Sequence, residues 1–179
     1  MLFPPLIEQN MLRKTTYTLK DGREIRISIA TERDAEDIIG IQEACYDGKA
    51  PWGRIAVNSE LRNKVSSFFL MCHHGGRAIA FIGLSKRHES LHVTNIATLP
   101  EYQKQGIASF LIKNAIDLSQ KLNKKRVTLE VRISNVTAQS LYRTLGFDDG
   151  PIKRNYYHNN GEDALDMIYL IDETDGWHE

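Results

Sequence analysis

Two hydrophobic periodicities alternate along this chain, and their order restricts the fold more than any other feature. Apolar residues take every second position in "EIRISIA" (24–30) and "KRVTLEVRI" (125–133), the pattern of strands that bury one face. Helical spacing holds over 107–122. Its apolar stripe is Ile107, Leu111, Ala115, Leu118 and Leu122, and its polar face is Lys113, Asp117, Gln120 and Lys121. The chain is therefore expected to build helices and strands into one unit.

Turn residues divide the remaining sequence into further elements. Gly75-Gly76 separates two apolar runs, 67–74 and 77–85, and this favours a hairpin because both glycines tolerate positive φ. The other predicted strands are 90–99, 152–158 and 164–171. The other predicted helices are 35–45 with Thr31 and Asp34 as its cap, 57–65, and 136–145 ending at Gly146.

This order of elements predicts a mixed α/β layer architecture, in which helices cover a largely antiparallel sheet. A chain of 179 residues suffices for one domain with a sizeable core, and we assign that domain to residues 23–172. Residues 1–22 are interpreted as an N-terminal extension with a short strand near 16–19. Residues 173–179 are interpreted as a C-terminal tail.

Charge and cysteine content exclude several classes of protein. The 23 Lys and Arg balance 23 Asp and Glu, so the formal net charge is zero. This argues against sequence-independent binding to nucleic acid or to an anionic membrane, which needs an excess of basic residues. The segment "MLFPPLIE" is too short for a membrane span and lacks the features of a signal peptide. Cys45 and Cys72 show no pairing pattern and suit a reducing compartment, so a cytoplasmic protein is expected. His73 and His74 are strand neighbours that face opposite ways, so no metal site is expected.

The start of the 107–122 helix lacks the usual cap. Helices commonly begin at Ser, Thr, Asp or Asn, but here Lys104, Gln105 and Gly106 hold the cap positions. Open N–H groups and the helix dipole attract anions, and Gly106 and Ala108 would let a diphosphate approach the main chain. The segment has neither the Gly-Lys-Ser/Thr of a P-loop nor a dinucleotide fingerprint. Taken alone, this Q-x-x-G-x-A pattern is also compatible with a plain strand-to-helix turn.

Further motifs surround this helix start. "NIATLPEYQKQGIA" is followed by "LEVRISNVTAQSLYRTLGF" and "RNYYHNNGEDALDM". Together they resemble GNAT acetyltransferases, and in particular the RimI-type and archaeal NatA-type N-terminal acetyltransferases, over residues 24–171. The resemblance implies the GNAT fold, a twisted, mostly antiparallel sheet of about six to seven strands flanked by about four helices. It also implies acetyl-CoA as the acetyl donor.

The resemblance implies how coenzyme A would be held. The backbone of one strand would pair with the pantetheine arm, and the loop after it would wrap the phosphates. These two segments are Ile96, Ala97 and Thr98, and Lys104, Gln105, Gly106, Ile107, Ala108 and Ser109. Gln103 stands where many relatives have Arg, which weakens the electrostatic part of phosphate binding but keeps the amides. Asn135 matches a coenzyme contact, although its position also suits a helix N-cap.

Catalytic roles follow from the same resemblance. Glu130 matches the general base, His92 a histidine that assists deprotonation through water in the archaeal members, and Tyr142 a coenzyme-contacting residue that protonates the departing thiolate. The residues alone also allow Glu130 to be an exposed partner of Arg132 and Tyr142 to be a core aromatic. Four residues match the peptide entrance, where packing aromatics are the alternative: Pro51, Trp52, Tyr156 and Tyr157.

The leading interpretation is an N-α-acetyltransferase that acts on protein N-terminal peptides by direct attack in a ternary complex. Its partners, by resemblance, include the ribosome or an auxiliary subunit. Two alternatives stay open: a GNAT enzyme acting on lysines or small amines, and a non-catalytic acyl-CoA-binding or interaction module, because a fold does not dictate function. An acyl-cysteine route is disfavoured, since Cys72 lies in a predicted strand and Cys45 near a predicted helix end, and neither thiol is expected to have a base beside it.

Overall fold

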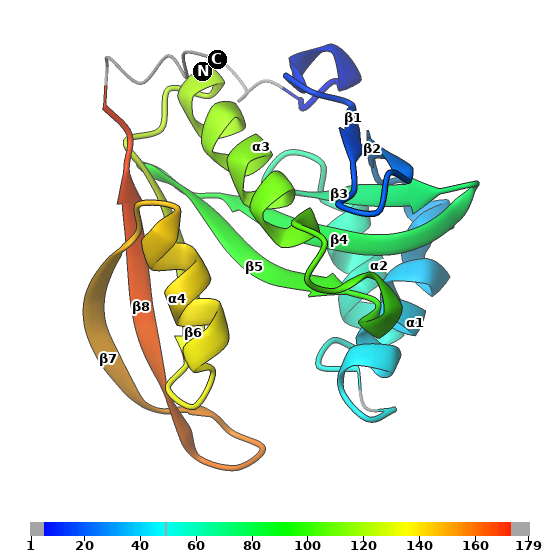
Figure 1. Ribbon diagram of the computed structural model, residues 1–179. Helices are drawn as coiled ribbons and strands as arrows, with labels where there is room; N and C mark the ends of the chain where they lie inside the picture. The colour runs from blue at the N-terminus through cyan, green and yellow to red at the C-terminus, as the bar shows by residue number, and fades with distance from the viewer. Residues whose placement is uncertain (1–5, 49, 173–179) are drawn as a thin grey trace.

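The computed structural model describes residues 6–48 and 50–172. The first five residues of the predicted extension and the predicted tail at 173–179 lie outside the described residues. The elements follow the predicted order (Figure 1). The strands are β1 (Thr16–Thr18), β2 (Glu24–Ile29), β3 (Ser67–His74), β4 (Arg77–Lys86), β5 (Ser90–Thr98), β6 (Arg126–Arg132), β7 (Asp148–Tyr157) and β8 (Glu162–Leu170). The helices are α1 (Ala35–Cys45), α2 (Arg54–Arg62), α3 (Ile107–Lys121) and α4 (Val136–Thr144).

The strands form one sheet in the order β1-β2-β3-β4-β5-β6-β8-β7. Neighbouring strands are antiparallel except β5 and β6, which are parallel and are joined through α3. The mixed, mostly antiparallel architecture is therefore confirmed. The expected six to seven strands were too few, because β1 in the N-terminal extension pairs with β2 and extends the edge of an eight-stranded sheet.

Helices cover the two faces of the sheet (Figure 1). Helices α1 and α2 pack on one face, and α3 and α4 lie on the other. The central strands β3 and β4 are consequently buried on both faces, which explains why they read as continuous apolar runs in the sequence. The predicted hairpin between them is confirmed, with φ of +55° at Gly75 and +83° at Gly76.

Helix α3 is more deeply buried than its sequence pattern predicted. Asp117, expected on the polar face, is only 9% exposed. Lys121 covers it, since its Nζ lies 2.8 Å from the Asp117 carboxylate and donates to the carbonyl oxygen of Met11 at 2.7 Å. The N-terminal extension therefore packs over a helix face that the periodicity assigned to solvent.

Two predictions about helix starts have different outcomes. Thr31 and Asp34 form the expected capping box before α1. Helix α2 begins at Arg54, three residues before the predicted start, with Gly53 as its N-cap. No helix in the described part of the chain is long and apolar enough to cross a membrane.

Candidate active site

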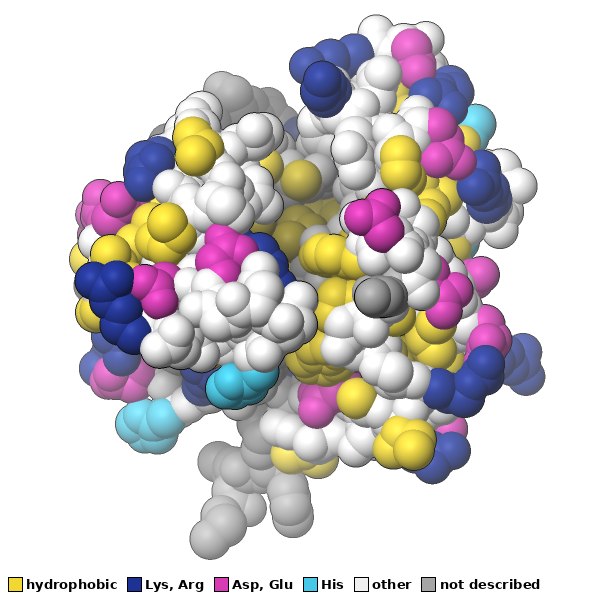
Figure 2. All heavy atoms as spheres, turned by 90° about the horizontal axis from the view of Figure 1, so that it is seen from below, with side chains coloured by type: hydrophobic (Ala, Val, Ile, Leu, Met, Phe, Trp, Pro, Cys, Tyr) yellow, Lys and Arg dark blue, Asp and Glu magenta, His cyan; other side chains and the backbone are white. Residues whose placement is uncertain are grey.

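Strands β5 and β6 separate partway along their length. They pair from Ser90–Val93 to Arg126–Leu129, but β5 continues to Thr98 and β6 to Arg132. The β4–β5 ladder is irregular at this point, and such bulges bend strands. Beyond the separation, the edge of β5 that faces β6 has no strand from the described residues beside it. Figure 2 shows a hollow with hydrophobic side chains between the two halves of the molecule.

The start of α3 follows directly after β5. Its N-cap, Gly106, has φ of +88° and provides no side-chain cap, and Lys104 also has a positive φ, +61°. Apart from bonds within α3, the amides from Lys104 to Ser109 donate to no other group of the described chain. The predicted open helix start is therefore confirmed.

Gln103 and Asn135, the two polar side chains matched to coenzyme contacts, both make protein contacts. Gln103 Nε2 donates to the carbonyl oxygen of Thr98 at 3.0 Å and so ties the loop to the end of β5. Asn135 Oδ1 accepts from the backbone N–H of Ala138 at 3.1 Å, which confirms it as the N-cap of α4. A role of either residue toward the coenzyme stays a prediction.

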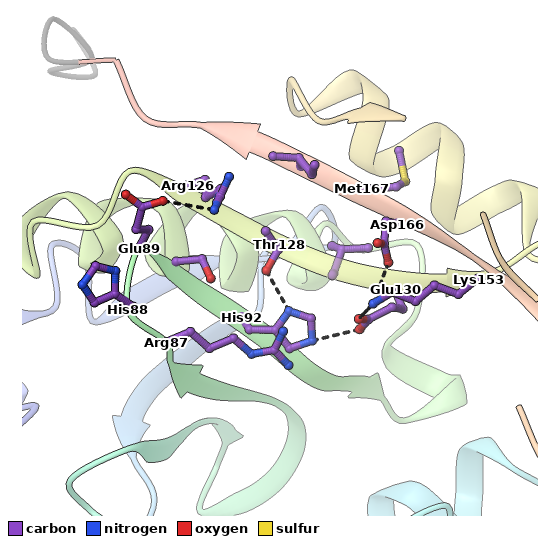
Figure 3. Close-up of a pocket in the computed structure, with 13 residues that line it drawn as sticks. Arg87, His88, Glu89, His92, Arg126, Thr128, Glu130, Lys153, Asp166 and Met167 are labelled. Carbon is purple, nitrogen blue, oxygen red and sulfur yellow. Dashed lines mark hydrogen bonds and ion pairs between the residues drawn. The ribbon is translucent and has the colours of Figure 1, made fainter. Parts of the chain in front are cut away.

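Glu130 on β6 is the centre of a buried network (Figure 3). Its Oε2 lies 2.8 Å from Nε2 of His92 on β5, and its Oε1 accepts from Nζ of Lys153 on β7 at 2.7 Å. The side chains of His92 and Glu130 are only 5% and 9% exposed. The structure thus brings together two residues that the sequence singled out. Glu130 is not an exposed partner of Arg132, which pairs with Glu162 instead.

The contacts around His92 set the orientation of its ring. A carboxylate only accepts hydrogen bonds, so Nε2 of His92 carries its hydrogen toward Glu130. Nδ1 lies 2.7 Å from Oγ1 of Thr128, which has a hydroxyl hydrogen to donate. With Thr128 as the donor to Nδ1, the ring is held between Thr128 and Glu130 in the tautomer that carries its hydrogen on Nε2.

These donors change the acidity of Glu130. Burial alone would raise the pKa, but the hydrogen bonds from His92 and Lys153 outweigh it and lower the pKa of Glu130 from 4.5 to about 2. A carboxylate with a lowered pKa stabilises the fold above its unfolded pKa, and this contribution is lost as the pH falls through the folded value.

This acidity predicts how stability depends on pH. Glu130→Gln is expected to lower the free energy of unfolding, measured with urea. The difference from wild type should be largest at pH values above the ordinary pKa of 4.5 and should decrease as the pH falls toward about 2. The reason is that protonated Glu130 loses its advantage over the neutral amide. Lys153→Met should reduce the size of the same pH dependence. A difference between wild type and Glu130→Gln that stays constant down to pH about 2 would contradict an ionised, paired Glu130.

Lys153 and Asp166 extend the network away from β6. Lys153 Nζ lies 3.2 Å from Oδ1 of Asp166, which is opposite Glu130 in the β6–β8 ladder. Burial lowers the pKa of Lys153, but the two carboxylates outweigh this and raise it. Lys153 is therefore a fixed positive charge beside Glu130. Sequence reasoning missed Thr128, Lys153 and Asp166, whose only signal was the alternation of side chains along their strands.

A cavity of about 420 Å³ opens beside this network (Figure 3). It continues from the buried pair toward the starts of β5 and β6. Its walls include His92, Glu130 and Lys153, together with Arg87, His88, Glu89 and Arg126. Among the described residues, no three His, Cys, Asp or Glu side chains are grouped so as to hold a metal ion.

Tyr142 on α4 is buried, and its ring packs against Phe147 at 5.8 Å between centroids. Within the described chain its hydroxyl has no hydrogen-bond partner. Burial raises the pKa of Tyr142, and the nearby Tyr46 and Tyr157 raise it further. The hydroxyl therefore stays protonated at neutral pH, as a proton donor must. The packing role and the donor role are compatible in this position.

The predicted peptide entrance is built from two separate segments. Tyr156 and Tyr157 end β7, their rings are 5.1 Å apart, and Arg132 lies 3.8 Å above the ring of Tyr157. Arg132 also bonds Glu162 and two asparagines at the tip of the β7–β8 hairpin. It therefore fixes the hairpin and the Tyr157 ring together, a role that sequence reasoning missed.

The other segment joins α1 to α2. Pro51 is exposed and Trp52 is half-buried against the core. Gln42 on α1, fully buried, bonds both backbone polar groups of Trp52 and also accepts from Nδ2 of Asn95 on β5 at 3.0 Å. Gln42 therefore ties this loop to β5. Whether either segment contacts a peptide stays a prediction.

Comparisons with known proteins agree with this geometry. Residues 28–147 match the Acetyltransferase (GNAT) family. The [ribosomal protein bS18]-alanine N-acetyltransferase of Escherichia coli strain K12 is 34% identical over 123 residues, 68% of this chain and 82% of that protein. An N-alpha-acetyltransferase of Sulfurisphaera tokodaii is 32% identical over 161 residues, 83% of this chain and 94% of that protein.

A solved structure supports the same assignment. The crystal structure of the ribosomal-protein-S18-alanine N-acetyltransferase from Escherichia coli superposes with a TM-score of 0.75 and 29% identity, over 87% of this chain and 99% of that one. The fold predicted by resemblance is thereby confirmed, and so is acetyl-CoA as the donor that the family uses. The chain belongs to the GNAT acetyltransferase family and is an acetyl-CoA-dependent N-acetyltransferase.

Proposed function

We propose that this enzyme transfers the acetyl group of acetyl-CoA to the free α-amino group of protein N-termini by direct attack in a ternary complex. The observation that carries the proposal is the buried contact of His92 with Glu130 close to the point where β5 and β6 separate. This arrangement sets a proton acceptor beside an open strand edge. The N-terminal acetyltransferase names of the relatives support the α-amine as the acceptor.

The residues present fit coenzyme A in three respects. The open amides from Lys104 to Ser109 suit a diphosphate, because a helix N-terminus attracts anions. The backbone of Ile96, Ala97 and Thr98 lies on the open edge of β5, where an amide-bearing arm can bind like an added strand. Gly106, with φ of +88°, places no side-chain cap on these amides and so leaves them available to a ligand.

The bound coenzyme supplies a thioester whose acyl carbon is open to attack by an amine. Glu130 keeps lone pairs beyond those used by His92 and Lys153 and can accept the amine proton through water. His92, held by Thr128, orients the carboxylate and takes part in this deprotonation. Tyr142 holds the proton that the departing sulfur needs.

The low basicity of Glu130 favours an acceptor that is easily deprotonated. An α-amino group has a pKa of about 7.7 to 8.0 and a lysine side chain about 10.4, a difference of about 3 to 4 kcal/mol in deprotonation. Because the pKa of Glu130 is only about 2, it is a weak base. A substrate that is already partly neutral near pH 7 suits it better than a lysine.

The two cysteines support direct transfer over an acyl-cysteine route. A nucleophilic cysteine needs a lowered pKa. Burial raises the pKa of Cys72 to about 12, and burial likewise raises the pKa of Cys45. Cys45 Sγ also donates to the carbonyl oxygen of Thr98 at 3.1 Å.

The names of the bacterial relatives point to a ribosomal acceptor. We therefore propose that the substrate is a ribosomal protein with an N-terminal alanine. Such an acceptor is met in the cytoplasm, a compartment that also suits two free thiols.

The test is a peptide assay by mass spectrometry with purified protein and acetyl-CoA. Three matched peptides carry a bS18-type Ala N-terminus: one free, one blocked but containing lysine, and one blocked without lysine. Acetylation is expected on the free α-amine alone. Acetylation of only the blocked lysine peptide would replace the proposal with a lysine acetyltransferase. CoA binding without turnover of any peptide or small amine would favour a non-catalytic module.

A further inference from the structure

Tyr17 of the N-terminal extension lies against the start of α3. It is the inward-facing residue of β1, between the exposed Thr16 and Thr18. Its ring stacks on that of Phe110, with centroids 5.0 Å apart and planes 19° apart. Its hydroxyl donates to the carbonyl oxygen of Gln105 at 3.2 Å, across 88 residues of sequence. A residue outside the family match at 28–147 therefore contacts the proposed phosphate loop.

The extension that carries Tyr17 is anchored independently of this contact. Gln9 donates to the carbonyl oxygen of Ile27 and accepts from the amide of Ile29. The carbonyl oxygen of Met11 accepts from Lys121 at the end of α3. Strand β1 itself pairs with β2. Tyr17 is thus presented from a framework that spans the sheet edge and the length of α3.

The loop that Tyr17 contacts has an unfavourable backbone conformation. Lys104 and Gly106 have φ of +61° and +88°, and a non-glycine residue such as Lys104 keeps such a conformation only where its surroundings hold it. A Cβ atom built on Gly106 would overlap the hydroxyl oxygen of Tyr17. Tyr17 therefore closes one side of this loop.

The hydrogen bond to Gln105 also sets the direction of an amide. In a trans peptide the C=O and N–H groups point in opposite directions, and the described residues contain no cis peptide. Because the carbonyl of Gln105 points at Tyr17, the N–H of Gly106 in the same peptide plane points away from it. That N–H is one of the open donors at the start of α3.

We propose that Tyr17 is a positioning residue that preorganises the amide donors for the coenzyme diphosphate. The inference rests on the proposed function, because it assumes that the diphosphate binds at this loop. Preorganisation raises affinity by removing the cost of ordering the loop at the moment of binding. Tyr17 does not touch the reacting atoms, so its effect falls on coenzyme affinity and not on the chemical step.

Tyr17→Phe tests this, because it keeps the ring stack and removes only the hydroxyl. The Kd for CoA, measured by calorimetry, is expected to rise about threefold to tenfold. The KM for acetyl-CoA should rise in parallel while kcat at saturating donor is unchanged. Tyr17→Ala should show a larger effect. Thr16→Ala, an exposed neighbour on β1, is the control and should keep the wild-type Kd.

A second donor separates positioning from a general loss of stability. S-acetylpantetheine has the same thioester but lacks the diphosphate and nucleotide, so its kcat/KM should be unaffected by Tyr17→Phe. Equal losses with both donors would overturn the proposal, as would a Tyr17→Phe enzyme with wild-type CoA affinity. If the wild type itself does not bind CoA, the proposed function fails, and this inference fails with it. If the wild type binds and Tyr17→Phe binds equally, only this inference is wrong.

Discussion

Replacing Glu130 with Gln is expected to lower kcat about 100- to 10,000-fold near pH 7 while leaving the Kd for CoA within about twofold. The carboxylate is the proton acceptor in the proposed reaction, and a neutral amide cannot take that proton. Gln also presents an NH₂ group to His92 or Lys153, both of which donate to Glu130. Steady-state kinetics with a free N-terminal peptide and calorimetry with CoA measure the two quantities.

Lys153→Met is the matched control for this variant. It removes the lysine partner of Glu130 but keeps the carboxylate and its contact with His92, so kcat should change far less. Thermal unfolding of both variants accounts for lost ion pairs, since breaking a buried pair also destabilises the fold. A Glu130→Gln enzyme with wild-type kcat, or one whose kcat falls only as much as its CoA affinity, would show that Glu130 is not the base.

The fold was largely predictable because its elements have strong local signals. Alternation in "KRVTLEVRI" gave β6, with Val127, Leu129 and Val131 buried as expected. The Gly75-Gly76 pair gave the hairpin between β3 and β4. The prediction that Asp117 faces solvent was wrong, because Lys121 and the N-terminal extension cover this side chain. The contact between Lys121 and Met11 joins residues far apart in the sequence. The periodicity of one helix carries no information about such a contact.

The candidate site was predictable only in part, because it depends on strand register. Resemblance singled out Glu130, His92 and Tyr142, and the structure brings the first two into contact. Thr128 faces His92 only because the two are register partners in the β5–β6 ladder. Asp166 reaches Lys153 beside Glu130 for the same reason in the β6–β8 ladder. A register shift of one residue would turn these side chains to the other face, and local sequence patterns do not reveal which residues of two strands pair.

Tyr17 shows the same limit at longer range. The short strand at 16–19 was predicted, but its partner was not. The bond to Gln105 spans 88 residues, and it exists only because β1 joins the edge of the sheet next to α3. The segment that the sequence separated as an extension is therefore part of the surroundings of the proposed coenzyme site.

Gly106→Glu is expected to weaken CoA binding at least about 100-fold, to the limit of detection by calorimetry. Three effects act in the same direction. A carboxylate would add a negative charge at the loop that carries the open amides, and this charge repels phosphate. A side chain at φ of +88° is strained. Its Cβ would also overlap the hydroxyl oxygen of Tyr17, which is itself held by Gln105 and Phe110.

Two glycine variants separate these effects. Gly22→Glu has the same φ of +88° but open space around its Cβ, so it reports the stability cost of the backbone alone and should keep wild-type CoA affinity. Gly106→Ala adds the strain and the overlap with Tyr17 without the charge, so its affinity should lie between those of wild type and Gly106→Glu. The charge of Glu acts mainly on an anionic ligand. The difference in kcat/KM between Gly106→Ala and Gly106→Glu should therefore be far smaller with S-acetylpantetheine than with acetyl-CoA. Unchanged CoA affinity in a folded Gly106→Glu protein would place the diphosphate elsewhere.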